Sequence, residues 1–406
     1  MAGVSQLLAL DPYVTDWLDL GLRWLHVIAA IAWIGSSFYF IALDYKLEPP
    51  RDADDAAEGI GGESWEIHGG GFYHVQKYRV APPRLPERLV WFKWEAYTTW
   101  LSGFALLILL YYLRPEVTLV DRSVAALANW QAILVSIALL AGGWAVYDVL
   151  CRLFGGRDLW LAAALLGLVV VTAWGSSELF AAQAAYLQVG AILGTIMAGN
   201  VLFEIIPAHW ELIRAKEAGR EPDPAPGLAA KQRSVHNNYL TLPVLFAMLA
   251  GHFPFTYGHS QAWLVLVALM VIGAWLRHFF NLHHQGRNVW AIPASAAIAL
   301  GLLAFAIRPG DGGSGGAGAV PSFATVASVV AQRCATCHSV RPTDPRFSSA
   351  PLGVALDTPE EIQARAQAIK AVAVDSRVMP LGNVTGMTDA ERDLLGRWIG
   401  AGAPIQ

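Results

Sequence analysis

The sequence has little charge and very little cysteine. Charged residues make up 15% of its 406 residues and apolar residues 55%, whereas a soluble domain usually carries about 25% charge. The net charge of −4 predicts no binding of nucleic acid. No basic segment precedes the first apolar run, which follows Asp11, Asp16 and Asp19, so we expect no cleaved signal peptide. This composition predicts an integral membrane protein in contact with the lipid bilayer.

Eight apolar runs approach the roughly 20 residues that cross a bilayer. The fourth and the sixth are the shortest. We therefore expect an all-α fold: a polytopic membrane helix bundle of about eight spans in residues 1–308, followed by a small separate domain. The runs are residues 17–43, 96–113, 125–150, 159–173, 181–206, 239–253, 262–280 and 289–307.

A glycine-rich linker divides this bundle from the C-terminal part. Residues 310–320 have the sequence GDGGSGGAGAV, which favours a flexible tether without helix or strand. The predicted division is thus a membrane domain at 1–308, a linker at 309–320 and a second domain at 321–406. Such a tether would let the C-terminal domain move between two partners.

The C-terminal domain contains the motif Cys334-Ala335-Thr336-Cys337-His338, which is typical of covalent haem attachment. Two thiols at this spacing add to the vinyl groups of one haem c, and His338 ligates its iron. Met379, which precedes a proline, is the expected second axial ligand, and Met387 is the alternative. A zinc site would need a second cysteine pair, and a thioredoxin-like pair would need a strand–helix–strand context; the sequence has neither.

The sequence around the motif predicts short helices. Residues 322–333 lead into the motif, and two capping boxes begin at Thr358 and Thr388. Three short helices around one haem resemble the small class I cytochromes c. A domain of this size has little apolar core of its own, so the haem would supply much of it.

Both chain ends are expected outside. An even number of spans puts them on one side, and haem c is attached on the outer side of a bacterial inner membrane, so the cytochrome domain would be periplasmic. The charge bias agrees, because the predicted inner loops hold most Lys and Arg residues, while Arg114 and Arg122 lie in outer loops. The long inner loop at 44–95 contains a predicted β-hairpin at residues 64–78.

Ionisable residues within the spans are functional candidates, because their burial in lipid is costly. In the outer part, His26 and His252 either bracket a haem b or serve as carbonyl donors and headgroup anchors. On the inner side, Arg277, Asn281 and His284 share one helix face, flanked by His278 and His283. Together with other inner-side groups they predict a polar pocket open to the cytoplasm. Those other groups are Glu95, Asn200, Glu204, His209, His236, Asn237 and Asn238.

Seven segments, in this order and on this architecture, resemble the membrane-integral, cytochrome c-linked urate oxidases (urate hydroxylases) of bacteria. The resemblance covers essentially the whole chain. It implies oxidation of urate to 5-hydroxyisourate with oxygen from water, and electron transfer through the haem to a terminal oxidase or soluble cytochrome c, without hydrogen peroxide. The segments are RWLH (23–26), WIG (33–35), LEPP (47–50), WFKWE (91–95), NVLFE (200–204), HNNY (236–239) and RHFFNLHH (277–284).

The predicted residue types suit a planar anion such as urate. Arg277 is expected to pair with it, Asn281 and Asn237 or Asn238 to hydrogen-bond its amide edges, and Trp94 to stack on it. A general base is also needed, and His284, His278 and Glu204 remain equal candidates. The predicted catalytic set is Glu204, His236, Arg277, His278, Asn281 and His284.

An inner substrate pocket and an outer haem lie far apart. Electrons would have to cross most of the ~30 Å bilayer, which one surface haem cannot bridge, so either a second cofactor lies in the bundle or the substrate site is nearer the outer face. Two other functions fit the same architecture. One is a quinol-to-cytochrome electron carrier without urate chemistry, and the other is a transporter or haem-handling protein with a sensory cytochrome.

Overall fold

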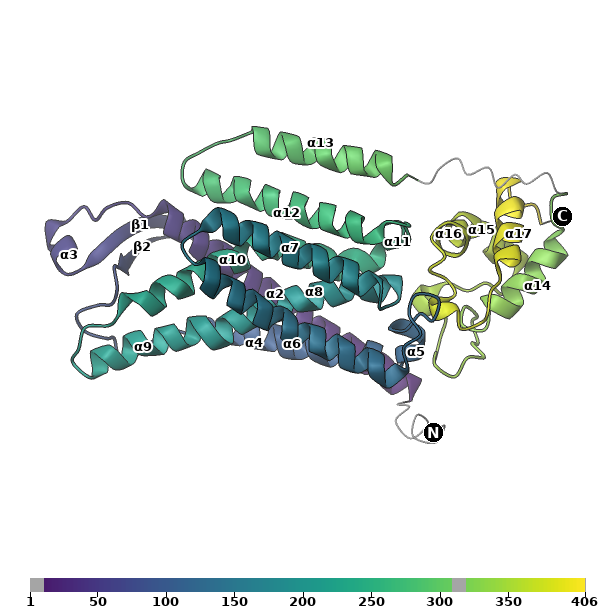
Figure 1. Ribbon diagram of the computed structural model, residues 1–406, viewed down its shortest axis with the longest axis horizontal. Coiled ribbons are helices and arrows are strands. Elements are labelled where there is room, and N and C mark those ends of the chain that lie inside the picture. Colours follow the sequence, from purple (N-terminus) through teal and green to yellow (C-terminus); the bar gives the residue numbers. More distant parts are fainter. Residues whose placement is uncertain (1–10, 309–318, 406) are drawn as a thin grey trace.

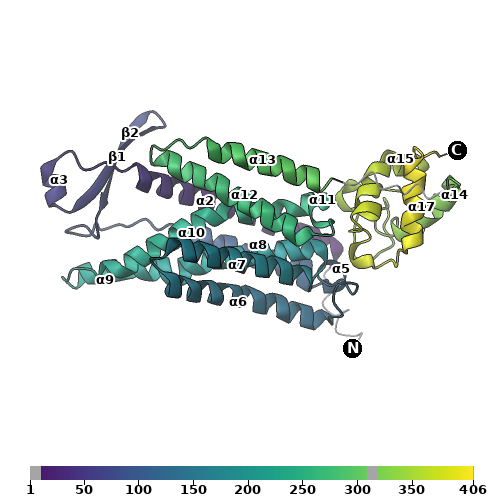
Figure 2. The same ribbon diagram turned by 45° about the horizontal axis from the view of Figure 1, so that its top comes forward.

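The structure is a computed structural model that describes residues 11–308 and 319–405. The predicted linker lies almost wholly outside the described residues. The described chain is a bundle of long helices with a hairpin at one end and a small helical domain at the other (Figures 1 and 2). The N-terminal end of helix α2 and the C-terminal domain lie at the same end of the bundle (Figure 1).

Five helices are long and apolar enough to cross a membrane. A shorter apolar helix, α13 (Ala291–Ala306), packs against α12. Two further predicted spans correspond to α4 (Trp94–Leu107), extended by the π-helical turn η1 (Ile108–Tyr112), and to α10 (Pro224–Leu249). The count of eight spans therefore stays a prediction. The five are α2 (Pro12–Lys46), α6 (Asn129–Phe154), α7 (Asp158–Ser177), the continuous Ala182–Glu217 and α12 (Ala262–His284).

Two helices extend well beyond the apolar runs that predicted them. The sixth run was expected to begin at residue 239, but α10 begins at Pro224, because Asp223 caps the helix and proline occupies its first position. The fifth run does not end near residue 206. There α8 (Ala182–Gly199) continues through the π-helical η2 (Asn200–Ile205) into α9 (Ile206–Glu217). Polar residues in these extensions broke the apolar pattern without breaking the helices.

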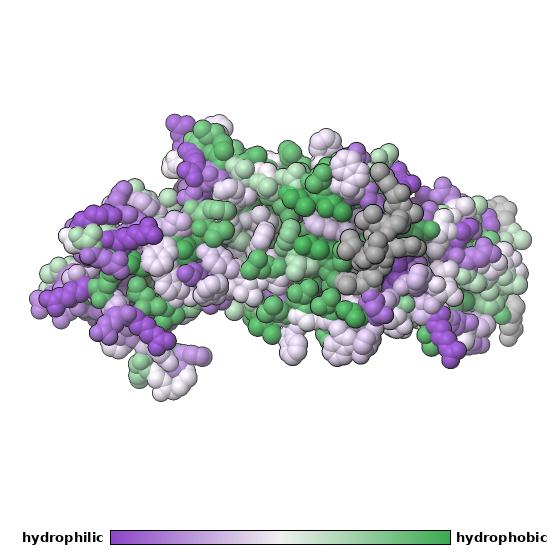
Figure 3. All heavy atoms as spheres, turned by 90° about the horizontal axis from the view of Figure 1, so that it is seen from below, coloured by the Kyte–Doolittle hydropathy of each residue, from purple (hydrophilic) through white to green (hydrophobic). Residues whose placement is uncertain are grey.

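The bundle is apolar outside as well as inside. Large apolar side chains of α2 are exposed, among them Trp24 and Ile31, and Figure 3 shows an apolar belt between two polar ends. Between α6, α8 and α10 lies a close-packed core that includes Tyr147, Val189 and Ile192. An exposed apolar belt around a packed helical core is the surface that a bilayer would cover.

The predicted hairpin is confirmed. Strand β1 (Ile60–His68) pairs antiparallel with β2 (Gly71–Tyr78), starting four residues before the expected segment. Gly69 and Gly70 form the turn with positive φ angles of 57° and 83°, as the two-residue turns of hairpins require. The short helix α3 (Ala53–Ala57) packs on β1. This unit lies at the end of the bundle away from the C-terminal domain (Figure 1).

The C-terminal domain is helical, and its helices begin as predicted. Thr358 and Thr388 both form complete capping boxes, and Ser322 caps the first helix. A core cluster of its own includes Leu395 and Trp398. The elements are α14 (Phe323–Arg333), η4 (Pro351–Gly353), α15 (Pro359–Ala364), α16 (Ala366–Ile369), η5 (Lys370–Asp375), η6 (Leu381–Asn383) and α17 (Asp389–Gly400).

Short elements at the end of the bundle contact this domain. Helix α5 (Pro115–Thr118) packs on η6, and α11 (Pro254–Tyr257), which follows η3 (Ala250–His252), packs on η5. Just before α5, the Arg114 guanidinium donates to the Arg346 carbonyl at 2.7 Å. The C-terminal domain is therefore docked on the bundle rather than separated from it.

Candidate functional site

Helices α10 and α12 bring four polar side chains together, as the sequence predicted for α12. Arg277, Asn281 and His284 recur on one face of α12, and Arg277 and Asn281 are 4% and 1% exposed. Arg277 Nε donates to Asn238 Oδ1 of α10 at 2.9 Å. The four residues Asn238, Arg277, Asn281 and His284 are called the arginine–amide site below.

Much of the hydrogen-bonding capacity of this site is unused. Among the described residues, five of its buried side-chain atoms have no hydrogen-bond partner: Asn238 Nδ2, Arg277 Nη2, Asn281 Nδ2, Asn281 Oδ1 and His284 Nδ1. Buried polar groups are nearly always paired, because an unpaired one costs about 1–3 kcal/mol. Five at one place indicate that a polar ligand or water completes the site.

The site adjoins a small apolar cavity of about 420 Å³. Phe38 of α2 forms one wall, with its ring centre 3.9 Å from Arg277 Cζ, and Arg277 and His284 also line the cavity. A guanidinium over an aromatic face is stabilised by cation–π attraction. Trp94, expected to stack on the substrate, is 65% exposed at the start of α4 and does not line this cavity. Phe38 is an aromatic residue that lines it.

The other predicted catalytic residues make different contacts. His278 Nδ1 lies 2.6 Å from the Tyr239 hydroxyl, and its ring stacks between Tyr239 and Trp275. Glu204 accepts from Arg152 at 2.7 Å. The predicted set thus divides, with Arg277, Asn281 and His284 in one place and Glu204 and His236 in another.

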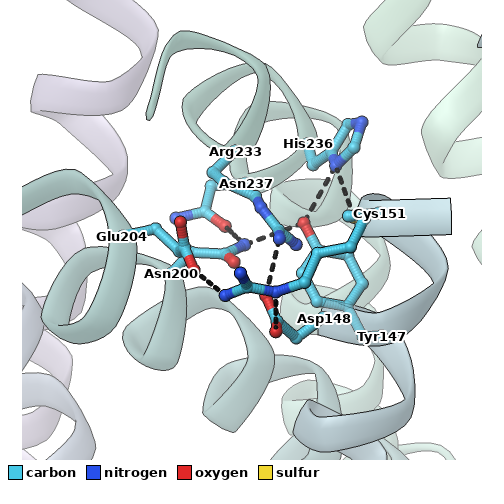
Figure 4. Close-up of polar contacts among 9 residues, drawn as sticks. Tyr147, Asp148, Cys151, Asn200, Glu204, Arg233, His236 and Asn237 are labelled. Atoms are coloured by element: carbon cyan, nitrogen blue, oxygen red, sulfur yellow. Dashed lines mark hydrogen bonds and ion pairs between the residues drawn. The ribbon is translucent and has the colours of Figure 1, made fainter. Parts of the chain in front are cut away.

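The second place is a network between α6, η2 and α10, shown in Figure 4. Tyr147 is at its centre, since its hydroxyl lies 2.9 Å from both His236 Nδ1 and Asn200 Nδ2. Asn200 Nδ2 also donates to Asn237 Oδ1 at 2.8 Å, and the Cys151 thiol lies 3.8 Å from His236 Nδ1. Neighbouring residues Asn237 and Asn238 of α10 thus have different partners, Asn237 in the network and Asn238 in the arginine–amide site.

The network also contains a buried ion pair that was not predicted from the sequence. Asp148 accepts from Arg233 at 2.6 Å and from Arg152 at 2.6 Å, and Arg233 is 4% exposed. A carboxylate inside the predicted apolar run 125–150 was the available signal, because a buried charge in a span needs a partner. Arg233 was missed because the sixth run was expected to begin after it.

The Cys334–His338 segment has features that fit covalent haem. All three cysteines are free thiols, so Cys334 and Cys337 are available for attachment. Burial raises the pKa of Cys334 to about 11. His338 Nδ1 lies 3.0 Å from the Val354 carbonyl, which can only accept, so the proton is on Nδ1 and Nε2 keeps its lone pair for a metal.

Both candidate methionines adjoin the same core. Met379 packs against it, and the Met379 carbonyl accepts from Arg392 at 2.8 Å. Met387 is 3% exposed, and its amide donates to Asn383 Oδ1 at 2.8 Å. Both lie in the segment that precedes α17, so Met379 stays the predicted ligand and Met387 its alternative.

Fold and site together define a class: a helical protein with helices long enough to span a membrane and a buried arginine–amide site at one end. The family model described as "Urate oxidase N-terminal" matches residues 12–308, so the chain belongs to this family and is related to urate oxidases. The match begins where α2 begins and ends before the C-terminal domain. No curated protein and no solved structure matches the chain significantly.

Proposed function

We propose that the chain is a multi-pass inner-membrane oxidoreductase that converts urate to 5-hydroxyisourate at the arginine–amide site. The observation that carries this proposal is the set of five buried, unpaired polar atoms beside a guanidinium, in a chain of the urate oxidase N-terminal family. Urate is a planar anion whose rim alternates N–H donors and carbonyl acceptors. A bound urate would balance the positive charge of the guanidinium and would give hydrogen-bond partners to the five unpaired atoms.

The side chains have complementary roles in this proposal. Arg277 Nη2 pairs with a urate oxygen, and the amide of Asn281 both donates to and accepts from one N–H/C=O edge. Asn238, held by Arg277, donates to a second acceptor. Phe38 holds the Arg277 guanidinium in place by cation–π contact. Charge pairing and the amide edge together would select urate over neutral planar bases.

His284 is the proposed general base. Urate and one water molecule become 5-hydroxyisourate with release of two electrons and two protons, so a group must take a proton as the carbon–oxygen bond forms. Glu204 is held by Arg152 and His278 by Tyr239, whereas His284 Nδ1 has no partner among the described residues. An imidazole is the side chain best suited to proton transfer near neutral pH.

The C-terminal domain is proposed to be a periplasmic cytochrome c. Cys334 and Cys337 would hold the haem, and His338 and Met379 would be its axial ligands. When bound, the haem takes one electron at a time and passes it to a terminal oxidase or soluble cytochrome c. The chain's part is to fix the imidazole, through its bond to the Val354 carbonyl, and to dock the domain on the bundle through Arg114.

The test is turnover by the detergent-purified full chain with urate and an external one-electron cytochrome acceptor. We expect two acceptor molecules to be reduced for every urate molecule consumed, without formation of hydrogen peroxide. The product should contain oxygen-18 when the reaction is run in oxygen-18 water. Reduction of the chain by quinol together with indifference to urate would overturn the proposal and favour an electron carrier.

A further inference from the structure

A second and much larger cavity lies between the bundle and the C-terminal domain. Its volume is about 1710 Å³, well above the roughly 300–1,000 Å³ of ordinary small-molecule sites. Residues from α2, α4, α8 and α10 line it within the bundle, and residues of the C-terminal domain close its outer end. A void of this size in a packed helical protein has room for a large cofactor.

His26 of α2 lines this cavity, and its imidazole is in the tautomer that a metal ligand needs. Its Nδ1 lies 2.9 Å from the Thr99 carbonyl of α4, which can only accept. The proton is therefore on Nδ1, and Nε2 keeps its lone pair. His338 in the haem c motif has the same arrangement with the Val354 carbonyl. A carbonyl that fixes the tautomer is usual behind a metal-bound histidine.

The contact between α2 and α4 is built around this ring. A Cβ atom added at Gly103 would lie 2.8 Å from His26 Cε1, so only glycine lets the imidazole lie against α4. In addition, the Ser102 hydroxyl lies 3.2 Å from His26 Nδ1. The ring is thus held against α4 by contacts at Nδ1 and Cε1, and it also lines the cavity. The alternative that His26 only donates to a carbonyl accounts for the contact at Nδ1 but not for the large cavity that the ring also lines.

The cavity is amphiphilic along its length. Apolar side chains such as Ile34, Leu187 and Val244 line the part within the bundle, and guanidinium groups gather toward the C-terminal domain. Haem has the same character, since a flat apolar ring carries two propionate carboxylates that arginine binds well. The lining arginines are Arg23, Arg114, Arg122, Arg346, Arg377 and Arg392, and the lining acids are Glu116, Asp121 and Asp389.

The cavity extends from the C-terminal domain toward the arginine–amide site. At its outer end it is lined by Pro380 and Met387, next to the haem c motif's core. Within the bundle it reaches Met197, whose carbonyl accepts from Asn237 at 3.0 Å, and Asn237 adjoins Asn238 of the arginine–amide site. A redox group in this space would stand between substrate and cytochrome.

We propose that this cavity binds a second, non-covalent haem of the b type, ligated by His26 Nε2. The described residues contain no group of three or more His, Cys, Asp or Glu that could hold a bare metal ion. A haem brings four nitrogen ligands of its own and needs only an axial imidazole. The electron-relay role, though not the haem site itself, rests on the proposed function: urate oxidation releases two electrons, and a haem held here would supply one-electron transfer between the substrate site and haem c.

The test is the haem content of the full chain, measured without urate. Acidified acetone releases haem b and leaves haem c on the protein. We expect one extractable haem for each covalent one in the wild type. His26→Ala should abolish the extractable haem and leave the covalent haem unchanged, and Gly103→Ala should reduce it by displacing the ring. His68→Ala, an exposed histidine of the hairpin, is the matched control and should retain both haems.

Two results would overturn the proposal: a wild-type chain with covalent haem only, or a His26→Ala variant with its full extractable haem. The covalent haem reports folding of the C-terminal domain, which has its own core, and elution of the detergent-purified variant as a single species at the wild-type volume reports folding of the bundle. Because this test does not use urate, absence of haem b would contradict only the haem b proposal and would not affect the urate proposal. Conversely, a chain that binds both haems but does not oxidise urate would support the haem b site and contradict its role as an electron relay.

Discussion

At the scale of single residues, the proposed recognition of urate depends on the unpaired atoms of the arginine–amide site. Asn281 is the clearest case, because both atoms of a 1% exposed amide have no partner among the described residues. A role in an apolar core or in a helix cap does not explain an amide at this position. A ligand that has one donor and one acceptor side by side would explain it.

Asn281→Ala should weaken urate binding. Loss of two hydrogen bonds in a buried site costs about 1–3 kcal/mol, and each 1.4 kcal/mol is about a tenfold change, so KM should rise by about 5- to 150-fold. Steady-state kinetics with the purified chain measure this. The exposed Asn288 is the control, and Asn288→Ala should keep the wild-type KM. An unchanged KM for Asn281→Ala would remove the amide from the substrate site.

His284→Ala should affect the chemical step. Removal of a general base typically lowers the rate by about 10²–10⁴-fold, so kcat should fall within that range while haem content stays normal. His283, its exposed neighbour, contacts Asn288 instead, and His283→Ala should retain wild-type kcat. Full turnover by His284→Ala would assign the base elsewhere, with His278 and Glu204 as the remaining candidates.

At the scale of elements, capping was the most informative local signal. Ser322, Thr358 and Thr388 were each predicted to begin a helix, and each caps one. The hairpin was also found, because Gly69 and Gly70 interrupt alternating residues. Hydrophobic pattern alone located the long helices but not their ends, since α10 continues through the polar residues 224–238.

The contacts between elements could not be predicted. That Asn237 and Asn238 face different clusters depends on how α10 packs between η2 and α12, and a one-residue difference in rotation would exchange them. Phe38 was missed because it lies in an apolar run where nothing distinguishes it from lipid-facing residues. The partner of His26 was missed for a different reason. Thr99 contributes its backbone carbonyl, which every residue has, so the residue type gives no signal.

Thr388→Ala should destabilise α17 locally. Loss of an N-cap hydroxyl costs about 1 kcal/mol, and α17 carries Leu395 and Trp398 of the domain core. Hydrogen–deuterium exchange should show faster exchange across α17. Thr358→Ala removes the equivalent cap of α15 and is the matched control. It should speed hydrogen exchange in α15 more than in α17. Equal protection of α17 in wild type and Thr388→Ala would contradict this role.

The same capping box predicts a pH dependence. The pKa of Glu391 is held below its ordinary value, mainly by the hydrogen bond from the Thr388 amide. Hydrogen bonds from Arg333 and the Thr388 hydroxyl lower the pKa further. Its stabilising effect is therefore present above the unfolded pKa of about 4.3 and is lost as pH falls through the folded pKa. Glu391→Gln should lower protection of α17 at neutral pH and match wild type in acid. A constant difference at every pH would refute this.

At the scale of the whole molecule, the two proposed redox sites lie at opposite ends of the bundle. The arginine–amide site lies toward the hairpin end of α12, and the C-terminal domain is docked on the other end through Arg114 and the α5–η6 contact. Substrate oxidation and electron delivery are therefore separated along the helices. The account joins them through the cavity that His26 and Met387 both line.

The most direct measurement is an anaerobic absorbance spectrum of the purified full chain before and after urate is added, with no external acceptor. The account predicts that urate alone reduces the chain's own haem c, and that Arg277→Gln, which lacks the anion-pairing group, leaves it oxidised. A wild-type haem c that stays oxidised with urate, yet is reduced by dithionite, would contradict the central claim that this bundle oxidises urate into its own cytochrome.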